Sequence, residues 1–412
     1  MPAPPAGPLT GIRVVDTSTV LAGPYATMLL GDLGADVVKV EPPEGDATRN
    51  WGPPWVGDEA AGTRTAAYFL SVNRNKRSLR LDLKQPAGVQ VLRRLLEPAD
   101  VFVENFRPDS LARLGLTEDA LTALNPRLVH LAISGYGPTG PEVGRPGYDF
   151  LLQAEAGLMS ITGAADADGG KPTKVGVAIA DVAAGLHAAV GILGALTGRD
   201  RSGSPAAGRG QRVDVSLLES TLSILVNQAQ NAFVSGAAPV RRGNAHPNIV
   251  PYQAFETADT EIVIAVGSER QWPRLCRALG LPALADDPRF ATNADRVTNR
   301  DELTATLQAR LGERSTDEWL AALGAADVPA APINDIPTAF ATDQARARRA
   351  SVEIQHPALG RMRQVSIPFE LAATPASIRT APPLLGEHAD EVLAGAGYSP
   401  AEIAALRAEG IV

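Results

Sequence analysis

The first part of the chain alternates short apolar runs with longer amphipathic segments. Residues 11–16, 35–41, 99–105 and 127–137 are short runs rich in apolar residues, which predicts buried strands. Residues 22–34 have helical spacing and end on a glycine, which predicts a helix between the first two strands. Strand, helix and strand in this order form a βαβ unit. We therefore predict an α/β fold with an open, Rossmann-like, mostly parallel sheet.

The middle of the chain carries a different pattern. Residues 197–211 are rich in Gly, Ser and Arg, which predicts an exposed linker. Residues 212–233 predict one strand that runs into a long helix. Residues 249–268 alternate apolar and polar positions around the turn "ADTE", which predicts two antiparallel strands. A second, smaller unit therefore begins near Gly243.

Helical patterns continue to about Ala326, residues 356–371 return to strand, and a charged helix closes the chain. These patterns predict a large domain and a smaller α+β domain. The expected boundaries are 1–215 with 340–412 for the large domain, 240–335 for the small domain, and 216–239 and 336–339 for the connections.

Composition limits the class of protein. Among the 412 residues 45% are hydrophobic and 20% are charged, which is typical of globular proteins. A formal net charge of −8 argues against a nucleic-acid partner. Cys276 is the only cysteine and the five histidines are scattered, so we expect no disulfide and no metal site. The first residues lack a secretory pattern and no run of about 18 uninterrupted apolar residues occurs, so we expect a cytoplasmic protein without membrane attachment.

One acid interrupts an apolar helical segment. Between Val175 and Leu196 the only ionisable side chains are Asp181 and His187, and a buried carboxylate is costly. Asp181 is expected to be a helix N-cap, a nucleophile held ionised by the positive helix end, or both. His187 lies six residues further on, on another helical face, and is expected to be a core histidine.

Several polar segments are candidates for ligand binding. Residues 73–84, "NRNKRSLRLDLK", hold five cations and one acid, which fits a solvated face or a site for a polyanion. Asn105, Phe106 and Arg107 follow a predicted strand at the usual ligand edge of a parallel sheet. Glu41 lies where a dinucleotide-binding acid would lie, but the preceding loop has a single glycine in place of G-x-G-x-x-G, which argues against NAD.

Seven segments together resemble one known family. They are "GIRVVDTSTVLAGP", "LGADVVKVEPPEGDATR", "NRNKRSLRLDLK", "ADVFVENFRPDSLARLGL", "NPRLVHLAISGYGPTGP", "GVAIADVAAGLHAAVGILGAL" and "PLLGEHADEVL". Nearly end to end, the chain resembles the class III CoA-transferases, which include formyl-CoA:oxalate CoA-transferase and the carnitine CoA-transferases. The resemblance implies an interlocked homodimer, coenzyme A as a substrate, and no other cofactor.

The resemblance also implies roles for individual residues. Asp181 corresponds to the family's nucleophile, which forms a mixed anhydride and then an aspartyl thioester with CoA. Pro42 stands where the formyl-CoA enzyme has a CoA-binding arginine, and Leu21 replaces its active-site glutamine, which argues against formyl-CoA and oxalate as substrates. The implied CoA contacts are Val20, Ala22, Leu81, Lys84, Asn105, Phe106 and Arg113, with Arg107 close by.

Two other functions compete with CoA transfer. The related α-methylacyl-CoA racemases share the fold and use a histidine in a "G-H-D" segment, where this chain has Tyr148 in "RPGYDF". A tyrosine with a pKa near 10 is poorly matched to removing a proton next to a thioester, which favours the transferase. A non-catalytic module that binds CoA or another nucleotide is the second alternative.

Two segments resemble a particular branch of the family. "PGYDFLLQAEAGLMSITG" and "NAHPNIVPYQAFETADTEIVIAVGSERQW" are similar to the succinyl-CoA:dicarboxylate enzymes, which include the glutarate and hydroxymethylglutarate transferases. The resemblance implies succinyl-CoA as donor and a dicarboxylate as acceptor. The expected substrate-binding residues are Tyr148, Arg242, Gly243, Asn244 and His246. Arg242 or His246 is expected to bind the remote carboxylate, because an arginine fork suits a carboxylate.

Overall fold

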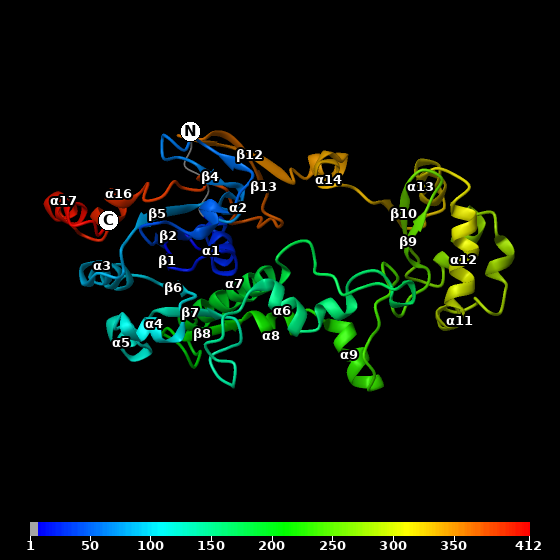
Figure 1. Ribbon diagram of the computed structural model, residues 1–412, viewed down its shortest axis with the longest axis horizontal. Coiled ribbons are helices and arrows are strands. Elements are labelled where there is room, and N and C mark those ends of the chain that lie inside the picture. Colours follow the sequence, from blue (N-terminus) through cyan, green and yellow to red (C-terminus); the bar gives the residue numbers. More distant parts are fainter. Residues whose placement is uncertain (1–6) are drawn as a thin grey trace. The chain divides into compact units, whose positions relative to one another are not determined.

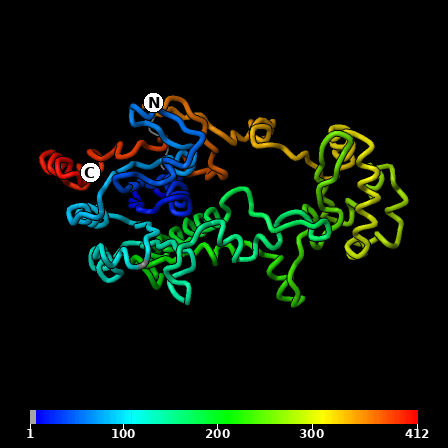
Figure 2. The backbone as a smooth tube through the Cα atoms, viewed as in Figure 1, coloured from blue at the N-terminus to red at the C-terminus, as the bar shows by residue number. Residues whose placement is uncertain are grey.

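The computed structural model describes residues 7–412 and divides into two compact units (Figure 1). Unit 1 runs up to Leu158 and also contains Val175–Gln230 and Asp343–Val412. Unit 2 contains Met159–Lys174 and Asn231–Thr342, so the stretch 159–174, which we expected in the large domain, groups with the small one. Both ends of the tube in Figure 2 belong to unit 1.

Unit 1 is built on a six-stranded sheet with the strand order β5-β2-β1-β6-β7-β8. Every neighbouring pair is parallel, as the βαβ pattern predicts. Val15 of β1 lies opposite Val38 on one side and Phe102 on the other. The strands are β1 (Arg13–Asp16), β2 (Asp36–Glu41), β5 (Lys76–Arg80), β6 (Val101–Glu104), β7 (Val129–Ser134) and β8 (Arg212–Ser216).

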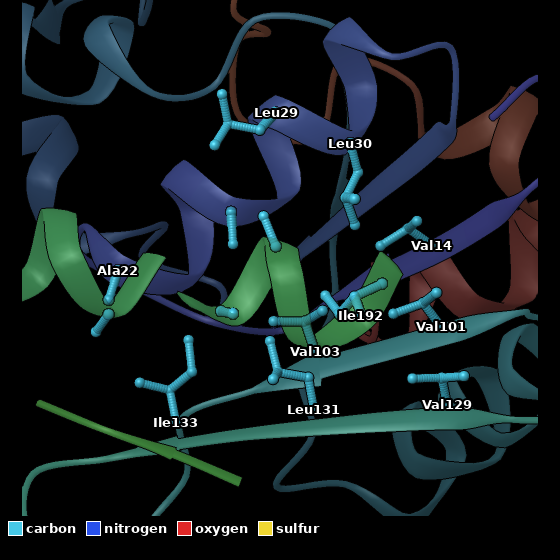
Figure 3. Packing of buried hydrophobic residues seen from close by; sticks show 14 of the residues in the cluster. Val14, Ala22, Leu29, Leu30, Val101, Val103, Val129, Leu131, Ile133 and Ile192 are labelled. Carbon is cyan, nitrogen blue, oxygen red and sulfur yellow. The ribbon is translucent and has the colours of Figure 1, made fainter. Parts of the chain in front are cut away.

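Alternate side chains of each strand enter separate cores, because successive residues of a strand point to opposite faces. On one face Val14, Val101 and Leu131 pack against α1 (Ala22–Asp32) and α7 (Ile179–Asp200) (Figure 3). The other face is covered by α3 (Pro86–Leu96), α16 (Ala389–Gly395) and α17 (Pro400–Ala408). The C-terminal helices therefore complete the core that the first hundred residues begin.

Helix α7 is longer and more central than expected. It continues to Asp200, into the predicted linker, because Arg199 near its end is buried and pairs with Asp100 at 2.9 Å. By length and composition it would suffice to cross a membrane, which the sequence pattern did not lead us to expect, but half of its apolar stretch is buried within the structure. A Cβ at Gly185 would lie 2.7 Å from the Ala22 carbonyl oxygen, so glycine permits the close packing of α7 on α1.

The predicted long helix after β8 is two helices. The first, α8 (Leu217–Ser223), is capped by Ser216, and the second, α9, is Val226–Ser235. Val226 has φ +37°, a value that interrupts an α-helix. The other elements of unit 1 are α2 (Ala67–Ser71), α4 (Pro108–Arg113), α5 (Glu118–Leu124), α6 (Asp149–Glu155), α15 (Asp343–Ala347), and the hairpins β3 (Trp55–Val56) with β4 (Thr65–Ala66) and β12 (Ser351–His356) with β13 (Gly360–Val365).

Unit 2 has its own core around Trp272, Trp319 and Phe255. Its sheet is antiparallel with the order β11-β10-β9, and the predicted "ADTE" turn joins β9 to β10. The elements are β9 (Tyr252–Glu256), β10 (Glu261–Ala265), α10 (Gln271–Ala278), α11 (Asn293–Thr298), α12 (Arg300–Leu311), α13 (Thr316–Ala325), β11 (Ala330–Pro332) and α14 (Ile336–Ala341).

Candidate active site

Two cavities lie at the carboxyl ends of the parallel strands of unit 1. The first has a volume of about 650 Å³ and is lined by residues that follow β1, β6 and β7. The second has a volume of about 940 Å³ and is lined by residues that follow β1, β2 and β5. Thr19 and Phe106 line both cavities. The two cavities therefore adjoin, and together they are large enough for a ligand of cofactor size.

All eight residues that the sequence places at a CoA site line these cavities. The first cavity contains Val20, Ala22, Asn105, Phe106 and Arg107. The second contains Leu81, Lys84 and Arg113 together with Phe106, and Pro42 is also on its wall. The fold thus brings together residues that are distant in the sequence. Their contact with CoA stays a prediction.

Unpaired cations lie beside both cavities. Lys84 and Arg113 at the second cavity and Arg107 at the first are exposed. Within residues 7–412 none of the three has a carboxylate partner at ion-pair distance. Such cations are available to phosphate groups.

The basic segment 73–84 only partly fits either of its two predicted interpretations. Arg74 is buried and pairs with Asp32 at 2.6 Å, and Lys76 is buried and contacts Asp16 at 3.2 Å. These cations neutralise internal carboxylates, so they form neither a solvated face nor a ligand site. Of this segment, only residues 81–84 line the second cavity.

Asp181 is not a helix N-cap, contrary to one of the sequence interpretations. The N-cap of α7 is Ala178, and Asp181 is the third helical residue. Asp149 supplies the missing acceptor from another helix: its Oδ1 accepts the N–H of Ala180 at 2.9 Å, and its Oδ2 accepts Gln153 Nε2 at 2.8 Å. Asp149 and Asp181 both line the first cavity. Two carboxylates therefore meet at the start of α7.

The environment of Asp181 favours its neutral form. Burial, and then the charge of Asp149, raise the pKa of Asp181 from 3.8 to about 7. This corrects the expectation that the positive helix end keeps the carboxylate ionised, because desolvation and a neighbouring like charge outweigh the helix end. Near neutral pH both protonation states are populated. Asp181 is then basic for a carboxylate while remaining able to ionise, which suits a nucleophile.

Two tyrosines belong to the surroundings of this pair. Tyr148 is 66% exposed, lines the first cavity and directly precedes α6. It follows Gly147, where a Cβ would lie 2.3 Å from the Cα of Gly135. Tyr68 of α2 lies within the electrostatic influence of the same two carboxylates. Burial, and then the charges of Asp181 and Asp149, raise the pKa of Tyr68 to about 12. Its hydroxyl is therefore protonated and available as a hydrogen-bond donor.

Leu21, the departure from the family glutamine, is buried in an apolar cluster with Met28 and Val72. Tyr68 and Val182 pack against this cluster. Since Val182 follows Asp181, the leucine adds apolar surface beside the carboxylate in place of an amide. An apolar side chain that packs in this cluster thus stands where the family pattern has a side chain that can form hydrogen bonds.

The prediction that His187 is a core histidine is wrong, because its side chain is exposed. Ala184 and Ala188 supply the buried face of this part of α7, and His187 falls between them on the outer side. Small residues on the buried face let α1 and α7 approach closely, which leaves no space there for an imidazole.

The predicted acceptor loop belongs to unit 2. Arg242, Gly243 and Asn244 are exposed, whereas His246 is half-buried. His246 Nδ1 accepts the N–H of Asn248 at 3.1 Å, which leaves Nε2 to carry the proton in the neutral ring. Burial, and then the charge of Arg300, lower the pKa of His246. The loop therefore presents a cation and a neutral imidazole.

A metal site and a reactive thiol were two further possibilities for chemistry in this chain. In the part of the chain from residue 7 onward, no group of three or more His, Cys, Asp or Glu side chains is arranged to hold a metal ion. Cys276 is buried in unit 2, and burial raises the pKa of its thiol to about 12. It is therefore a poor nucleophile.

A family model for CoA-transferase family III matches residues 9–389. The chain belongs to this family. It is 43% identical to the succinate–glutarate CoA-transferase of Agrobacterium fabrum, over 94% of this chain and 95% of the relative. It is 39% identical to the human succinyl-CoA:glutarate CoA-transferase, over 98% of this chain and 90% of the relative. A crystal structure of a CAIB/BAIF family protein from Brucella suis superposes with a TM-score of 0.83 at 41% identity, covering 95% of this chain and all of that one.

The protein is thus a CoA-transferase, and its site contains residues that the sequence analysis missed. Asp149 stands next to Tyr148 in "RPGYDF", but nothing in the sequence shows that it accepts a hydrogen bond from α7, 31 residues further on. Tyr68 lies in a segment without any motif that we used. Only the tertiary fold brings both residues to Asp181.

Proposed function

We propose that this CoA-transferase moves CoA from succinyl-CoA to a dicarboxylate of the glutarate class, with Asp181 as the nucleophile. The observation that carries the proposal is the cavity that holds Asp181, in which burial and Asp149 raise the pKa of that carboxyl to about 7. The names of the relatives from Agrobacterium fabrum and human support this donor and acceptor.

The proposed reaction consists of four acyl-transfer steps. An oxygen of ionised Asp181 attacks the thioester carbon of the donor, the C–S bond breaks, and CoA thiolate leaves a mixed anhydride. The thiolate attacks the Asp181 carboxyl carbon, which releases the donor acid and forms an aspartyl thioester. The acceptor carboxylate attacks the carbon of this thioester, the C–S bond breaks, and CoA thiolate leaves a second anhydride. The thiolate then attacks the acceptor acyl carbon, which restores the Asp181 carboxylate.

The adjoining cavities fit a long CoA molecule in this proposal. Its phosphates would lie near Lys84 and Arg113, whose charges have no carboxylate partner among the described residues. Phe106 lines both cavities and would contact the part of CoA that lies between the phosphates and the thioester. The thioester would then reach Asp181. No other cofactor takes part, because carboxylates and a thiolate supply every nucleophile.

The acceptor's remote carboxylate would be bound by the loop that contains Arg242, Gly243, Asn244 and His246. Arg242 has no carboxylate partner at ion-pair distance among the described residues, and its guanidinium matches a carboxylate. Tyr148 would line the acceptor side of the first cavity.

A three-way assay distinguishes the transferase from its competitors. The protein is incubated with succinyl-CoA and a panel of acids, and separately with a 2-methylacyl-CoA. We expect CoA exchange with dicarboxylates and no epimerisation. Epimerisation without exchange would establish the racemase instead, and binding of CoA without either reaction would establish a binding module.

Trapping tests the covalent intermediates directly. In the presence of donor, hydroxylamine or borohydride should modify Asp181, and mass spectrometry of a proteolytic digest locates the adduct. Asp149 is the matched control because it lines the same cavity but is not the proposed nucleophile. A donor-dependent adduct elsewhere, with none at Asp181, would contradict the mechanism.

The proposed assembly is an interlocked homodimer. Unit 1 is formed from both chain ends and unit 2 is inserted between its segments, an arrangement that linked rings require. Phe150 of α6, Val190 of α7 and Leu222 of α8 are exposed on helices that pack together, and such apolar surface is typical of an interface. Sedimentation should give twice the mass of the chain, and Val190→Glu should weaken the dimer. A stable, active wild-type monomer would contradict this assembly. A cytoplasmic location stays a prediction.

A further inference from the structure

Arg300, the first residue of α12, contacts the predicted acceptor loop within unit 2. Its Nη1 donates to the carbonyl oxygen of His246 and its Nη2 to that of Pro247, both at 2.9 Å. The guanidinium thus binds two consecutive carbonyls with both arms of its fork. Carbonyl groups are neutral, so these contacts leave the positive charge of Arg300 without a counterion.

The charge of Arg300 adds to that of Arg242. Burial, and then the Arg242 charge, lower the pKa of Arg300, whereas the adjacent Asp301 acts in the opposite direction. Asp301 is not within ion-pair distance of Arg300, and among the described residues no carboxylate is within that distance of Arg242. Arg300 binds the loop directly after the turn in which the Ala245 N–H donates to the Arg242 carbonyl at 3.0 Å, so two guanidinium groups without a direct counterion are associated with one short loop.

The neighbouring Arg241 shows the opposite arrangement. It forms an ion pair with Asp166 and donates to the carbonyl oxygens of Ser160 and Gly170 at 3.2 Å. Arg241 therefore fixes the base of the loop and its charge is neutralised. Of the two consecutive arginines, only Arg242 is available to a ligand.

Two side chains of the loop that Arg300 holds carry hydrogen-bond donors. Arg242 carries only donors, and His246 has its Nδ1 occupied by the Asn248 N–H, so its Nε2 carries a proton. His246 is further held by its own N–H, which donates to the Tyr252 carbonyl at 2.9 Å. A rigid group of donors with excess positive charge is complementary to a carboxylate.

We propose that Arg300 is a specificity-determining residue that makes this loop select acceptors with a second carboxylate. It acts in two ways: its fork holds the His246–Pro247 backbone, and its unneutralised charge adds to that of Arg242. This inference rests on the proposed function, because it assumes that the loop binds the acceptor. It assigns a role to a residue on a helix that carries none of the sequence motifs.

Asn293 offers a matched control for the loop-holding role. Its Nδ2 donates to the Asn248 carbonyl at 2.8 Å and its Oδ1 accepts the Val250 N–H at 3.1 Å. Asn293 therefore holds the same loop with two backbone hydrogen bonds but without a charge. Asn293→Ala loosens the loop and leaves its electrostatic field unchanged.

The test compares glutarate with valerate, a monocarboxylate of the same chain length, as acceptors. Arg300→Gln should raise KM for glutarate about 10-fold or more and change KM for valerate much less, because only glutarate has the second carboxylate. Arg300→Lys keeps the cation and should recover most of the selectivity. Asn293→Ala should affect both acids to the same degree.

Three results would overturn the inference. One is an Arg300→Gln enzyme with equal KM changes for both acids, and another is an Arg300→Lys enzyme as unselective as Arg300→Gln. If Arg300→Gln does not fold, Arg300→Lys alone decides, because loss of selectivity with the charge retained contradicts the charge effect. The third is measured by calorimetry on Asp181→Ala, which has no proposed turnover: equal glutarate affinity with and without Arg300→Gln. A wild type that transfers CoA to valerate but not to glutarate would instead refute the proposed acceptor.

Discussion

Unit 1 holds two groups of carboxylates at the same edge of one sheet: one group is half-buried without cation partners, and the other is fully buried and paired with lysines. Asp181 and Asp149 have no cation at ion-pair distance among the described residues, and the pKa of Asp181 rises to about 7. Asp16 and Asp46 are fully buried, and Lys76 and Lys39 contact them at 3.2 and 3.0 Å. Burial raises the pKa of Asp16 and of Asp46, yet the ammonium charges and the hydrogen bonds to each carboxylate together outweigh it, so each pKa lies below its ordinary value.

The difference corresponds to two tasks. Asp46 accepts the N–H of Val20 at 3.2 Å, and Asn105 exchanges two hydrogen bonds with the Thr19 backbone. Val20 has φ +72°, an unfavourable value for a β-branched residue. The neutralised carboxylates therefore hold a strained loop on the cavity wall, whereas the carboxylate without a counterion is the one proposed to react. Counterions distinguish the structural acids from the acid that is proposed to react.

The largest expected effect separates activity from stability at Asp181. Asp181→Ala should lower the rate of CoA exchange by roughly 10³-fold or more, because the nucleophile is lost. Its unfolding transition should stay cooperative. The rate is measured by chromatography of the CoA esters with succinyl-CoA and glutarate. An Asp181→Ala enzyme with more than a few per cent of the wild-type rate would refute the nucleophile.

At Asp46, by contrast, we expect a substitution to lower the stability of the fold. Asp46→Ala leaves Lys39 buried without its ion-pair partner and should lower the free energy of unfolding by about 3–5 kcal/mol. Urea denaturation followed by circular dichroism measures this change. Glu59→Ala, which removes the exposed ion pair with Arg64, is the control and should change stability little. Equal effects of the two substitutions would show that the buried pair contributes no more than a surface pair.

Asp181→Asn should stabilise the protein in alkaline solution. The folded pKa of Asp181, about 7, exceeds the ordinary value of 3.8, so the folded state binds the proton more tightly. The protonated Asp181 contributes its whole stabilising free energy below about pH 4, and this contribution is lost as the pH rises through 7. An asparagine stays neutral, so at pH 8 it should gain roughly 2–4 kcal/mol over wild type. Thermal unfolding of both proteins at pH 4 and pH 8 checks the difference, which should vanish at pH 4.

The smallest expected effect is a shift in the pH profile. If the ionised Asp181 reacts, kcat at pH 6 should be about 10-fold below its value at high pH. Asp149→Asn retains an acceptor for the Ala180 N–H but removes the like charge, so the midpoint should move to lower pH and the loss at pH 6 should become smaller. Rates from pH 5 to pH 9 measure the profile. A midpoint that does not move would mean that Asp149 acts only through its hydrogen bond.

Much of this fold follows from the sequence because its signals are local. The strands around Val15, Val38 and Phe102 are short apolar runs, and their parallel pairing follows from the helices between them. Asp181 could be selected because it is an acid in an apolar helix. The extension of α7 to Asp200 depends on the pairing of Arg199 with Asp100, which local patterns do not contain. The break at Val226 has no visible cause in the sequence pattern.

The pairing of acids with cations could not be predicted from the sequence, because it also depends on contacts between distant residues. Lys76 meets Asp16 across 60 residues, and Asp149 reaches α7 across 31. A basic stretch such as 73–84 looks alike whether its cations face solvent, a ligand or a buried acid. Which acid receives a counterion is decided only when the strands are assembled.

Because the C-terminal segment completes the core of unit 1, this unit can finish folding only late in synthesis. The N–H of Asp82 donates to the carbonyl of Ile411, and Leu393 and Ile403 complete the core on that face of the sheet. A ribosome adding 5–20 residues per second needs roughly 15–65 s to pass from the first of these partners to the last. Throughout that interval one apolar face of the nascent sheet lacks α16 and α17 and is only partly covered. The catalytic unit therefore stays incomplete until its C-terminal segment has been synthesised, and a chain released before then would present that face to chaperones.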